Sequence, residues 1–228
     1  MKLWGFCGEG VMIAVCRIAL ISIACFIFGS HALGQQDVFH GCAMEGTTKI
    51  KSVQALNQLK NRFTAPSSQD IDQSITLAAM LKRGNDRSRW KNTQAAEITG
   101  YVAEIVPGGK ESVNCCNSKM TASQCPNHDT HIALVIDPKQ QGKTRHVVVE
   151  VTPRWREIKG KGGEDWSHPT LQKTLFHKWI KVRGWMMFDV EHVNASENTA
   201  PGSANNWRAT AWEVHPVTSI EILPGPPK

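Results

Sequence analysis

Five apolar, strand-like segments, interrupted once by a helix-like segment after the third, constrain the fold most strongly. Within the third, Val147, Val149 and Val151 alternate with His146, Val148 and Glu150, which gives the strand one aliphatic face and one mixed face. Strands of this kind need a shared interior for their aliphatic faces, so we expect a small closed sheet. The strand-like segments are residues 96–106, 130–137, 145–153, 179–189 and 206–223, and the helix-like segment is 168–178.

This element order resembles the OB-fold, a five-stranded Greek-key barrel, across residues 94–223. The resemblance is one of topology and carries no sequence motif; it implies ligand binding on one face and in two loops. A five-stranded sandwich with a covering helix is the alternative. Ser167 is a suitable N-cap, and Leu171 and Leu175 would plug one end of the barrel. Pro216 predicts a bulge or break in the last strand.

The N-terminal segment, residues 1–34, has the composition of a cleaved signal peptide. An unbroken apolar run covers residues 18–28, and Ala32, Leu33 and Gly34 supply small residues for cleavage before Gln35. Either Met1 or Met12 could be the true start. We expect a secreted or periplasmic protein without stable membrane insertion, an uncleaved membrane anchor being the alternative.

Residues 35–93 read as a helical extension of the barrel, with two short helices that cover an edge or an open end. A partner-binding arm is the alternative for this segment. Residues 224–228 read as a disordered tail. The formal net charge of +6 suits an anionic partner without demanding one, because no dense run of Lys and Arg occurs.

Four cysteines remain after the predicted cleavage: Cys42, Cys115, Cys116 and Cys125. In an oxidising compartment this even number favours two disulfides, with Cys125 joined to Cys115 or Cys116 and the other of these joined to Cys42. The alternatives are free thiols or a zinc site that uses Cys116, Cys125 and His128, although the spacing matches no strong zinc signature.

Histidines and carboxylates gather at the ends of two long polar loops, 107–130 and 189–206. Loops of this length in a small domain are usually functional or disordered. If the loops converge, the side chains could hold a metal or act as acid and base; otherwise they are separate residues on a polar face. A glutamate among the valines of VVVEV also needs a partner or water. The residues of this polar cluster are Asp129, His131, Glu150, His192 and His215.

Arginine, lysine and tryptophan side chains offer a second candidate surface. Their combination suits stacking on bases or sugars together with ion pairing to phosphate or carboxylate, although tryptophans also bury well in ordinary cores. We therefore predict an exported binding module for an oligomeric, anionic ligand, either a nucleic acid or an acidic glycan. Its binding residues would be Arg154, Trp155, Arg156, Lys181, Arg183, Trp185, Trp207 and Arg208.

Several segments, including GYVAEIVPGG, DTHIALVIDP, VVVEVTPRWR and WRATAWEVHPVTSIEI, resemble an uncharacterised group of exported bacterial proteins. The resemblance implies an envelope or secreted location and brings no activity or catalytic residues. Thermonuclease also uses this type of barrel, but its arginine and aspartate motifs are not recognisable here. We expect a non-enzymatic protein without a cofactor. The alternatives are a metal-dependent hydrolase built on the polar cluster and a structural envelope protein.

Overall fold

The structure is a computed structural model and describes residues 38–117, 119–121, 124–125, 127–139, 142 and 144–227. The predicted signal peptide, residues 1–34, lies outside these ranges. Among the helices in the described ranges, none combines the length and the apolar character needed to cross a lipid bilayer.

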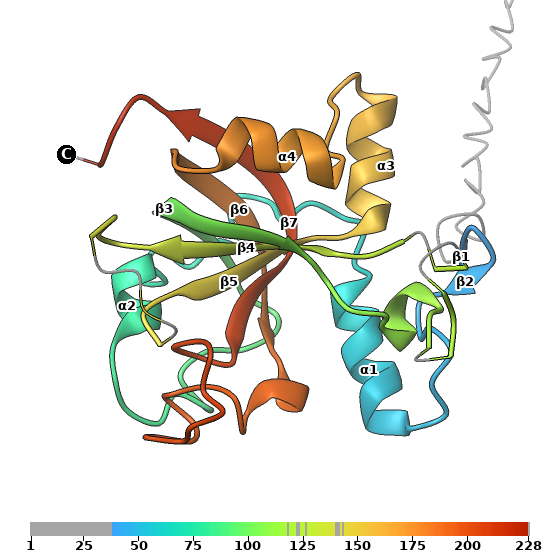
Figure 1. Ribbon diagram of the computed structural model, residues 1–228, viewed down its shortest axis with the longest axis horizontal. Helices are drawn as coiled ribbons and strands as arrows, with labels where there is room; N and C mark the ends of the chain where they lie inside the picture. The colour runs from blue at the N-terminus through green and yellow to red at the C-terminus, as the bar shows by residue number, and fades with distance from the viewer. Residues whose placement is uncertain are drawn as a thin grey trace, which may run out of the picture. The chain divides into compact units, whose positions relative to one another are not determined.

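Five strands form a closed barrel in the order β3-β4-β5-β7-β6, with β6 paired back to β3 (Figure 1). All neighbouring strands are antiparallel except β5 and β7, which run parallel through the register Val149–Val214. The predicted five-stranded, OB-fold-like barrel is confirmed. The strands are β3 (Ala95–Pro107), β4 (Thr130–Val135), β5 (Val147–Val151), β6 (Trp179–Phe188) and β7 (Trp212–Leu223).

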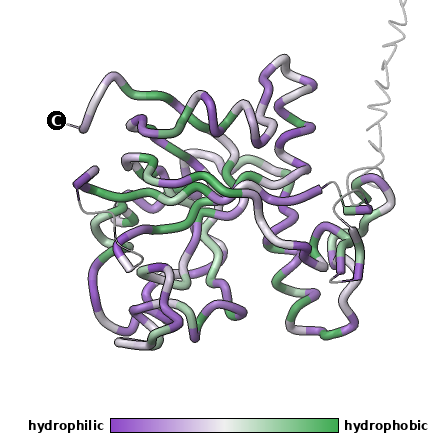
Figure 2. The backbone as a smooth tube through the Cα atoms, in the orientation of Figure 1, coloured by the Kyte–Doolittle hydropathy of each residue, from purple (hydrophilic) through white to green (hydrophobic). Residues whose placement is uncertain are grey.

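The barrel interior is filled by the aliphatic faces that the alternation predicted. Figure 2 shows hydrophobic residues along the backbone of the barrel strands. Ile132 and Leu134 of β4 and all three odd-numbered valines of β5 are fully buried in one core cluster. Leu171 and Leu175 of α4 (His168–Leu175) belong to the same cluster, as predicted for the end plug. Ser167 occupies the N-cap of α4, but its hydroxyl contacts Thr170 Oγ1 and no backbone N–H.

The last strand is irregular at the predicted position. Between β6 and β7 the register shifts so that Gly184 lies opposite Val217 and Met186 lies opposite Val214, which bulges β7 at Pro216. A Cβ at residue 184 would lie 2.3 Å from the carbonyl oxygen of Pro216. Glycine is therefore the residue that allows β6 to approach the bulge this closely.

Outside the barrel, α1 (Lys51–Lys60) and α2 (Leu77–Leu81) supply the two short helices expected in the extension, and Figure 1 shows them at separate places beside the barrel. A small hairpin, β1 (Val38–Phe39) with β2 (Cys42–Ala43), precedes them. The helix α3 (Pro153–Lys161) was not predicted. Its signal is Thr152 at the N-cap followed by proline at the first helical position.

Disulfides join Cys42 to Cys115 and Cys116 to Cys125. Both predicted pairings are confirmed, so the zinc-site alternative for Cys116, Cys125 and His128 is wrong: the sulfur atoms are bonded to each other and are not thiolates. The two bonds fasten the loop that carries η2 (Ser112–Asn114) to the hairpin strand β2 and close it on itself. Two disulfides also fit an oxidising compartment.

Candidate functional site

The outward faces of β4, β5 and β7 are buried beneath a second layer. Register pairs His131 with Glu150 across β4 and β5, and the parallel β5–β7 pairing brings Glu213 and His215 beside Glu150. The end of α1 covers this face: Lys60 is 3% exposed, and Arg62, just beyond the helix, donates to the carbonyl oxygens of Met186 and His215. The mixed face of the barrel is therefore an interior of its own.

Seven side chains of alternating charge form a continuous series in this interior, which we call the charged chain. Glu150 Oε2 lies 3.3 Å from His131 Nε2 and 3.2 Å from His215 Nδ1. His215 Nδ1 is also 3.2 Å from Glu213 Oε2, whose other oxygen lies 2.5 Å from Arg208 Nη2. Arg208 Nη1 reaches Asp189 at 3.4 Å, and Asp189 pairs with His192. In order, the charged chain is His131, Glu150, His215, Glu213, Arg208, Asp189 and His192.

Burial alone would favour the neutral form of every member, and the neighbouring charges oppose it. For His131, burial lowers the pKa but Glu150 outweighs it and raises the pKa to about 9. The pKa of His215 is raised in the same way, chiefly by Glu150. For Glu213, burial raises the pKa, but Arg208 and His215 hold it well below its usual range. The ionised forms of His131, His215 and Glu213 are thus stabilised by their charged neighbours.

A second buried ion pair flanks the charged chain. Lys60 Nζ lies 2.8 Å from Glu111 Oε2, and Glu111 belongs to the disulfide-fastened loop. Burial would lower the pKa of Lys60, but Glu111, Glu150, Asp189 and Glu213 together raise it well above its ordinary value. This pair therefore couples α1 and the loop electrostatically to the charged chain.

Asp129 differs from its neighbours because its charge is not compensated by a direct contact. It is 2% exposed, and neither carboxylate oxygen has a hydrogen-bond partner within the described ranges. Burial raises its pKa to about 6. One donor atom each of Asp129, Glu150 and His215 lies within 4.8 Å of the other two, and His215 Nε2 also lacks a partner in the part of the chain described. These three residues have the spacing of a small cation site.

Local structure fixes Asp129 at this place. The Gly108 N–H donates to the Asp129 carbonyl oxygen at 2.7 Å, and a Cβ at residue 108 would lie 2.9 Å from His131 Nε2. Arg156 of α3 donates to the carbonyl oxygen of His128 and, at 3.3 Å, to Thr130 Oγ1. The segment around Asp129 is therefore held on both sides by hydrogen bonds.

Asp129 also lines a recess that opens between this segment and the start of α4, with a volume of about 340 Å³. His128, Arg156 and His168 contribute the other titratable groups of its wall. The recess borders the edge of the buried cluster, and both carboxylate oxygens of Asp129 are buried.

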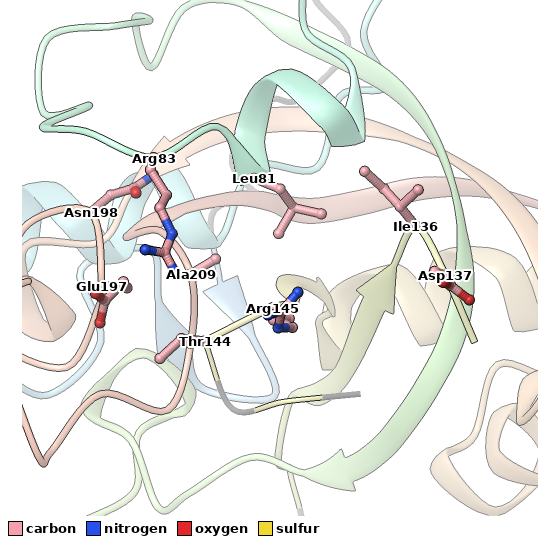
Figure 3. A pocket seen from close by; sticks show the side chains of 9 residues that line it. All are labelled: Leu81, Arg83, Ile136, Asp137, Thr144, Arg145, Glu197, Asn198 and Ala209. Carbon is pink, nitrogen blue, oxygen red and sulfur yellow. The ribbon is translucent and has the colours of Figure 1, made fainter. Parts of the chain in front are cut away.

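A separate cavity of about 400 Å³ lies near the end of α2, where the β4–β5 loop meets the long loop before β7. Figure 3 shows Arg83 and Arg145 beside an apolar floor that includes Leu81 and Ile136. None of the residues lining it is a member of the charged chain. The recess at Asp129, in contrast, includes a residue of the predicted polar cluster.

The predicted polar cluster is largely assembled. Asp129, His131, Glu150 and His215 come together as one group. His192 lies at the opposite end of the charged chain, paired with Asp189 and packed against Trp207.

The predicted Arg/Trp set is not assembled into one exposed surface. Arg154 and Trp155 are about 95% buried and bond to Asn61 Oδ1, Cys42 O and Arg62 O, while Arg208 is fully buried in the charged chain. Lys181 and Arg183 pair with Glu97 and Glu221 on the outer face of β6. The Trp185 indole donates to Thr64 O, and Trp207 packs between His146 and His192. Arg156 alone of the set lines the recess at Asp129.

Sequence reasoning missed Lys60, Asp189 and Glu213 as parts of the site, and it assigned Arg208 to the Arg/Trp surface instead. Glu213 and His215 do share one face of the last strand, and that pattern is a readable signal. Arg208 and Lys60 gave no such signal, because arginine and lysine are rarely buried without a known partner.

No protein-family model matches this sequence, and no curated protein is significantly similar to it.

Proposed function

We propose that the protein is an exported, metal-dependent hydrolase whose divalent cation is held by Asp129, Glu150 and His215. The observation that carries this proposal is the buried Asp129 carboxylate, which has no hydrogen-bond partner within the described ranges. An uncompensated buried carboxylate is costly, and a cation placed against two further donor atoms would remove that cost. Export is supported by the two disulfides and by the apolar N-terminal sequence.

The donor set favours a transition-metal cation. Two carboxylates and one imidazole suit zinc or manganese better than calcium, and three protein ligands leave coordination positions for water and substrate. Glu213 Oε2 is hydrogen-bonded to His215 Nδ1 at 3.2 Å, which leaves Nε2 as the nitrogen without a partner in the described structure. A carboxylate behind a ligating imidazole is the usual support of such a site.

A bound cation would supply Lewis acidity and an activated water. The protein groups supply positioning and proton transfer. His131 is held by Glu150 at 3.3 Å, its pKa is raised to about 9, and its side chain is 17% exposed. It is therefore a protonated group at the edge of the cluster, suited to donate a proton to a leaving alcohol or amine.

The anionic-ligand binding module remains the second candidate. Its support is now limited to Arg156 and to the surface residues of β6, because Arg154, Trp155 and Arg208 are engaged inside the protein. The metal-dependent hydrolase accounts for more residues of the assembled polar cluster and is therefore the preferred proposal.

Metal content tests the proposal. The mature protein, secreted by a host with an oxidising compartment, should carry or take up one equivalent of zinc or manganese after dialysis, as measured by elemental analysis. Asp129→Asn and His215→Gln keep the side-chain volume and remove donor character, so each should weaken metal binding at least tenfold. Asp70→Asn, at a partly exposed aspartate whose carboxylate accepts hydrogen bonds from Ser67, is the matched control and should retain the metal.

Circular dichroism and the melting temperature establish that the variants are folded. A wild-type protein that takes up neither metal at saturating concentration would contradict the proposal. So would an Asp129→Asn variant that retains stoichiometric metal.

A further inference from the structure

The recess beside Asp129 combines the unpartnered carboxylate with a wall of cationic and donor groups. Arg156 is only partly exposed there, and its two hydrogen bonds, to His128 O and Thr130 Oγ1, occupy two of the five N–H groups of its guanidinium. The remaining N–H groups can serve a ligand in the recess.

Two histidines extend this wall. His128 Nδ1 lies 2.9 Å from the Gly109 carbonyl oxygen, so Nδ1 carries the hydrogen of that bond. His168 Nδ1 is buried and has no hydrogen-bond partner in the described structure. Both residues line the same recess as Arg156, which suits a ligand with several oxygen atoms.

The charge of the Asp129 carboxylate determines whether an anionic ligand can bind in the recess. An anion placed at the Arg156 guanidinium in the recess would lie near the Asp129 carboxylate, whose oxygens are buried, and the carboxylate charge would repel it. A divalent cation held by Asp129 would reverse this local charge and bind the anion from the other side. The two ligands should therefore bind cooperatively, and thermodynamic linkage requires each to strengthen the other equally.

We propose that the recess binds the phosphoryl group of the substrate, with Arg156 contacting its oxygens, and that the substrate is a small phosphate ester. This inference rests on the proposed function. Arginine suits phosphate because its planar fork offers parallel N–H donors, and a recess of about 340 Å³ accommodates a small phosphorylated molecule. Hydrolysis consumes only water. The water oxygen bonds to phosphorus while the phosphorus–ester oxygen bond breaks. The leaving alcohol takes up a proton from solvent, and the proton lost by the attacking water returns to solvent.

Calorimetric titration with inorganic phosphate tests the inference in the wild type and in Arg156→Gln, each with and without saturating zinc or manganese. The metal should tighten phosphate binding to the wild type at least tenfold. Arg156→Gln should weaken phosphate binding at least tenfold, measured with the metal at a concentration that saturates each variant. Lys159→Gln, on the same helix but paired with Glu164 outside the recess, is the matched control and should bind phosphate normally. In the presence of metal, the rate of p-nitrophenyl phosphate hydrolysis should be lower for Arg156→Gln than for the wild type and for Lys159→Gln.

The outcomes separate the two proposals. Metal binding without phosphate binding, or phosphate binding indifferent to Arg156→Gln, overturns the inference and leaves the metal site intact. Absence of metal binding contradicts the proposed function. If phosphate binding still depends on Arg156 in that case, the phosphate site in the recess is supported without the metal site. If Arg156→Gln does not fold, Arg156→Lys and His168→Asn replace it. Unchanged phosphate affinity in both of these variants would equally overturn the inference.

Discussion

The two faces of the sheet formed by β4, β5 and β7 are both buried, but they are stabilised in different ways. The inward face consists of aliphatic side chains such as Leu134 and Val149 that need only close packing. The outward face consists of charged side chains such as Glu150 and Glu213 that need partners of opposite charge in defined positions. Neighbouring residues of one strand therefore contribute to two interiors with different tolerances to substitution.

Arg208→Met should give the largest loss of stability, because it removes the arginine from the ion pairs of the outward face. Arg208 is fully buried between Glu213 and Asp189, so its loss leaves these two buried carboxylates with their histidine partners but without the guanidinium that they share. We expect the free energy of unfolding to fall by about 3–5 kcal/mol, measured by urea denaturation. Arg183→Met, which removes a solvent-exposed pair with Glu97, is the control and should cost less than about 1 kcal/mol. Equal losses of unfolding free energy in the two variants would show that the buried ion pairs of Arg208 contribute no more to stability than the exposed ion pair of Arg183.

Leu134→Ala tests the inward face. The side chain is completely buried in the core cluster, and truncation should cost about 2–5 kcal/mol through lost burial and the cavity left behind. Because no charge is involved, the loss should be the same in low and high salt, measured by denaturant titration. A strongly salt-dependent loss would contradict the separation of the two faces.

Removing the Cys116–Cys125 disulfide should loosen the cover of the outward face and leave the inward face unchanged. The bond closes a short loop, with a sequence separation of 9, so the paired Cys→Ala variant should lose about 2–3 kcal/mol in the chain-entropy model. Amide hydrogen exchange should increase around Asp129, while Val147 and Val149 of β5 stay protected. Uniformly faster exchange across the barrel would contradict this local effect.

His146 gives the smallest predicted effect, a pH dependence. Burial, with a contribution from Arg208, lowers its pKa from 6.5 to about 4, so the folded protein keeps it neutral. The unfolded chain takes up a proton below about pH 6.5. Stability contributed by neutral His146 is therefore present above that pH and is lost as the pH falls toward 4, by about 1–3 kcal/mol. His146→Gln should flatten this part of the stability curve, and parallel curves for the two proteins would contradict the assignment.

Much of the barrel could be predicted from the sequence because alternation directly reports which side chains share a face. Val147, Val149 and Val151 occupy the core as predicted. The even number of cysteines predicted two disulfides but left open whether Cys115 or Cys116 pairs with Cys125, and the structure pairs Cys116 with Cys125. The polar cluster was predicted only in part. His131 and Glu150 lie on neighbouring antiparallel strands, whereas the link from Glu150 to His215 depends on the parallel β5–β7 register.

Arg208 shows why the rest could not be predicted. In the sequence it follows a tryptophan in a polar loop and reads as a surface residue, but Glu213 and Asp189 draw it into the interior. A buried cation is recognisable only when its partners are known, and these partners come from other elements of the barrel. The same reasoning accounts for Lys60, whose partner Glu111 belongs to a distant loop.

The parallel pairing of β5 with β7 also has a consequence for the order of assembly. β7 is the last strand of the chain and closes the barrel by inserting between β5 and β6. Until it is in place, β5 is an unpaired edge of the kind that associates with other chains. Before closure, Glu150 and the neighbouring His131 stay hydrated on the strands that await it, and charges on an exposed edge oppose intermolecular pairing. The residues that become the buried cluster would thus protect the chain against association while it folds.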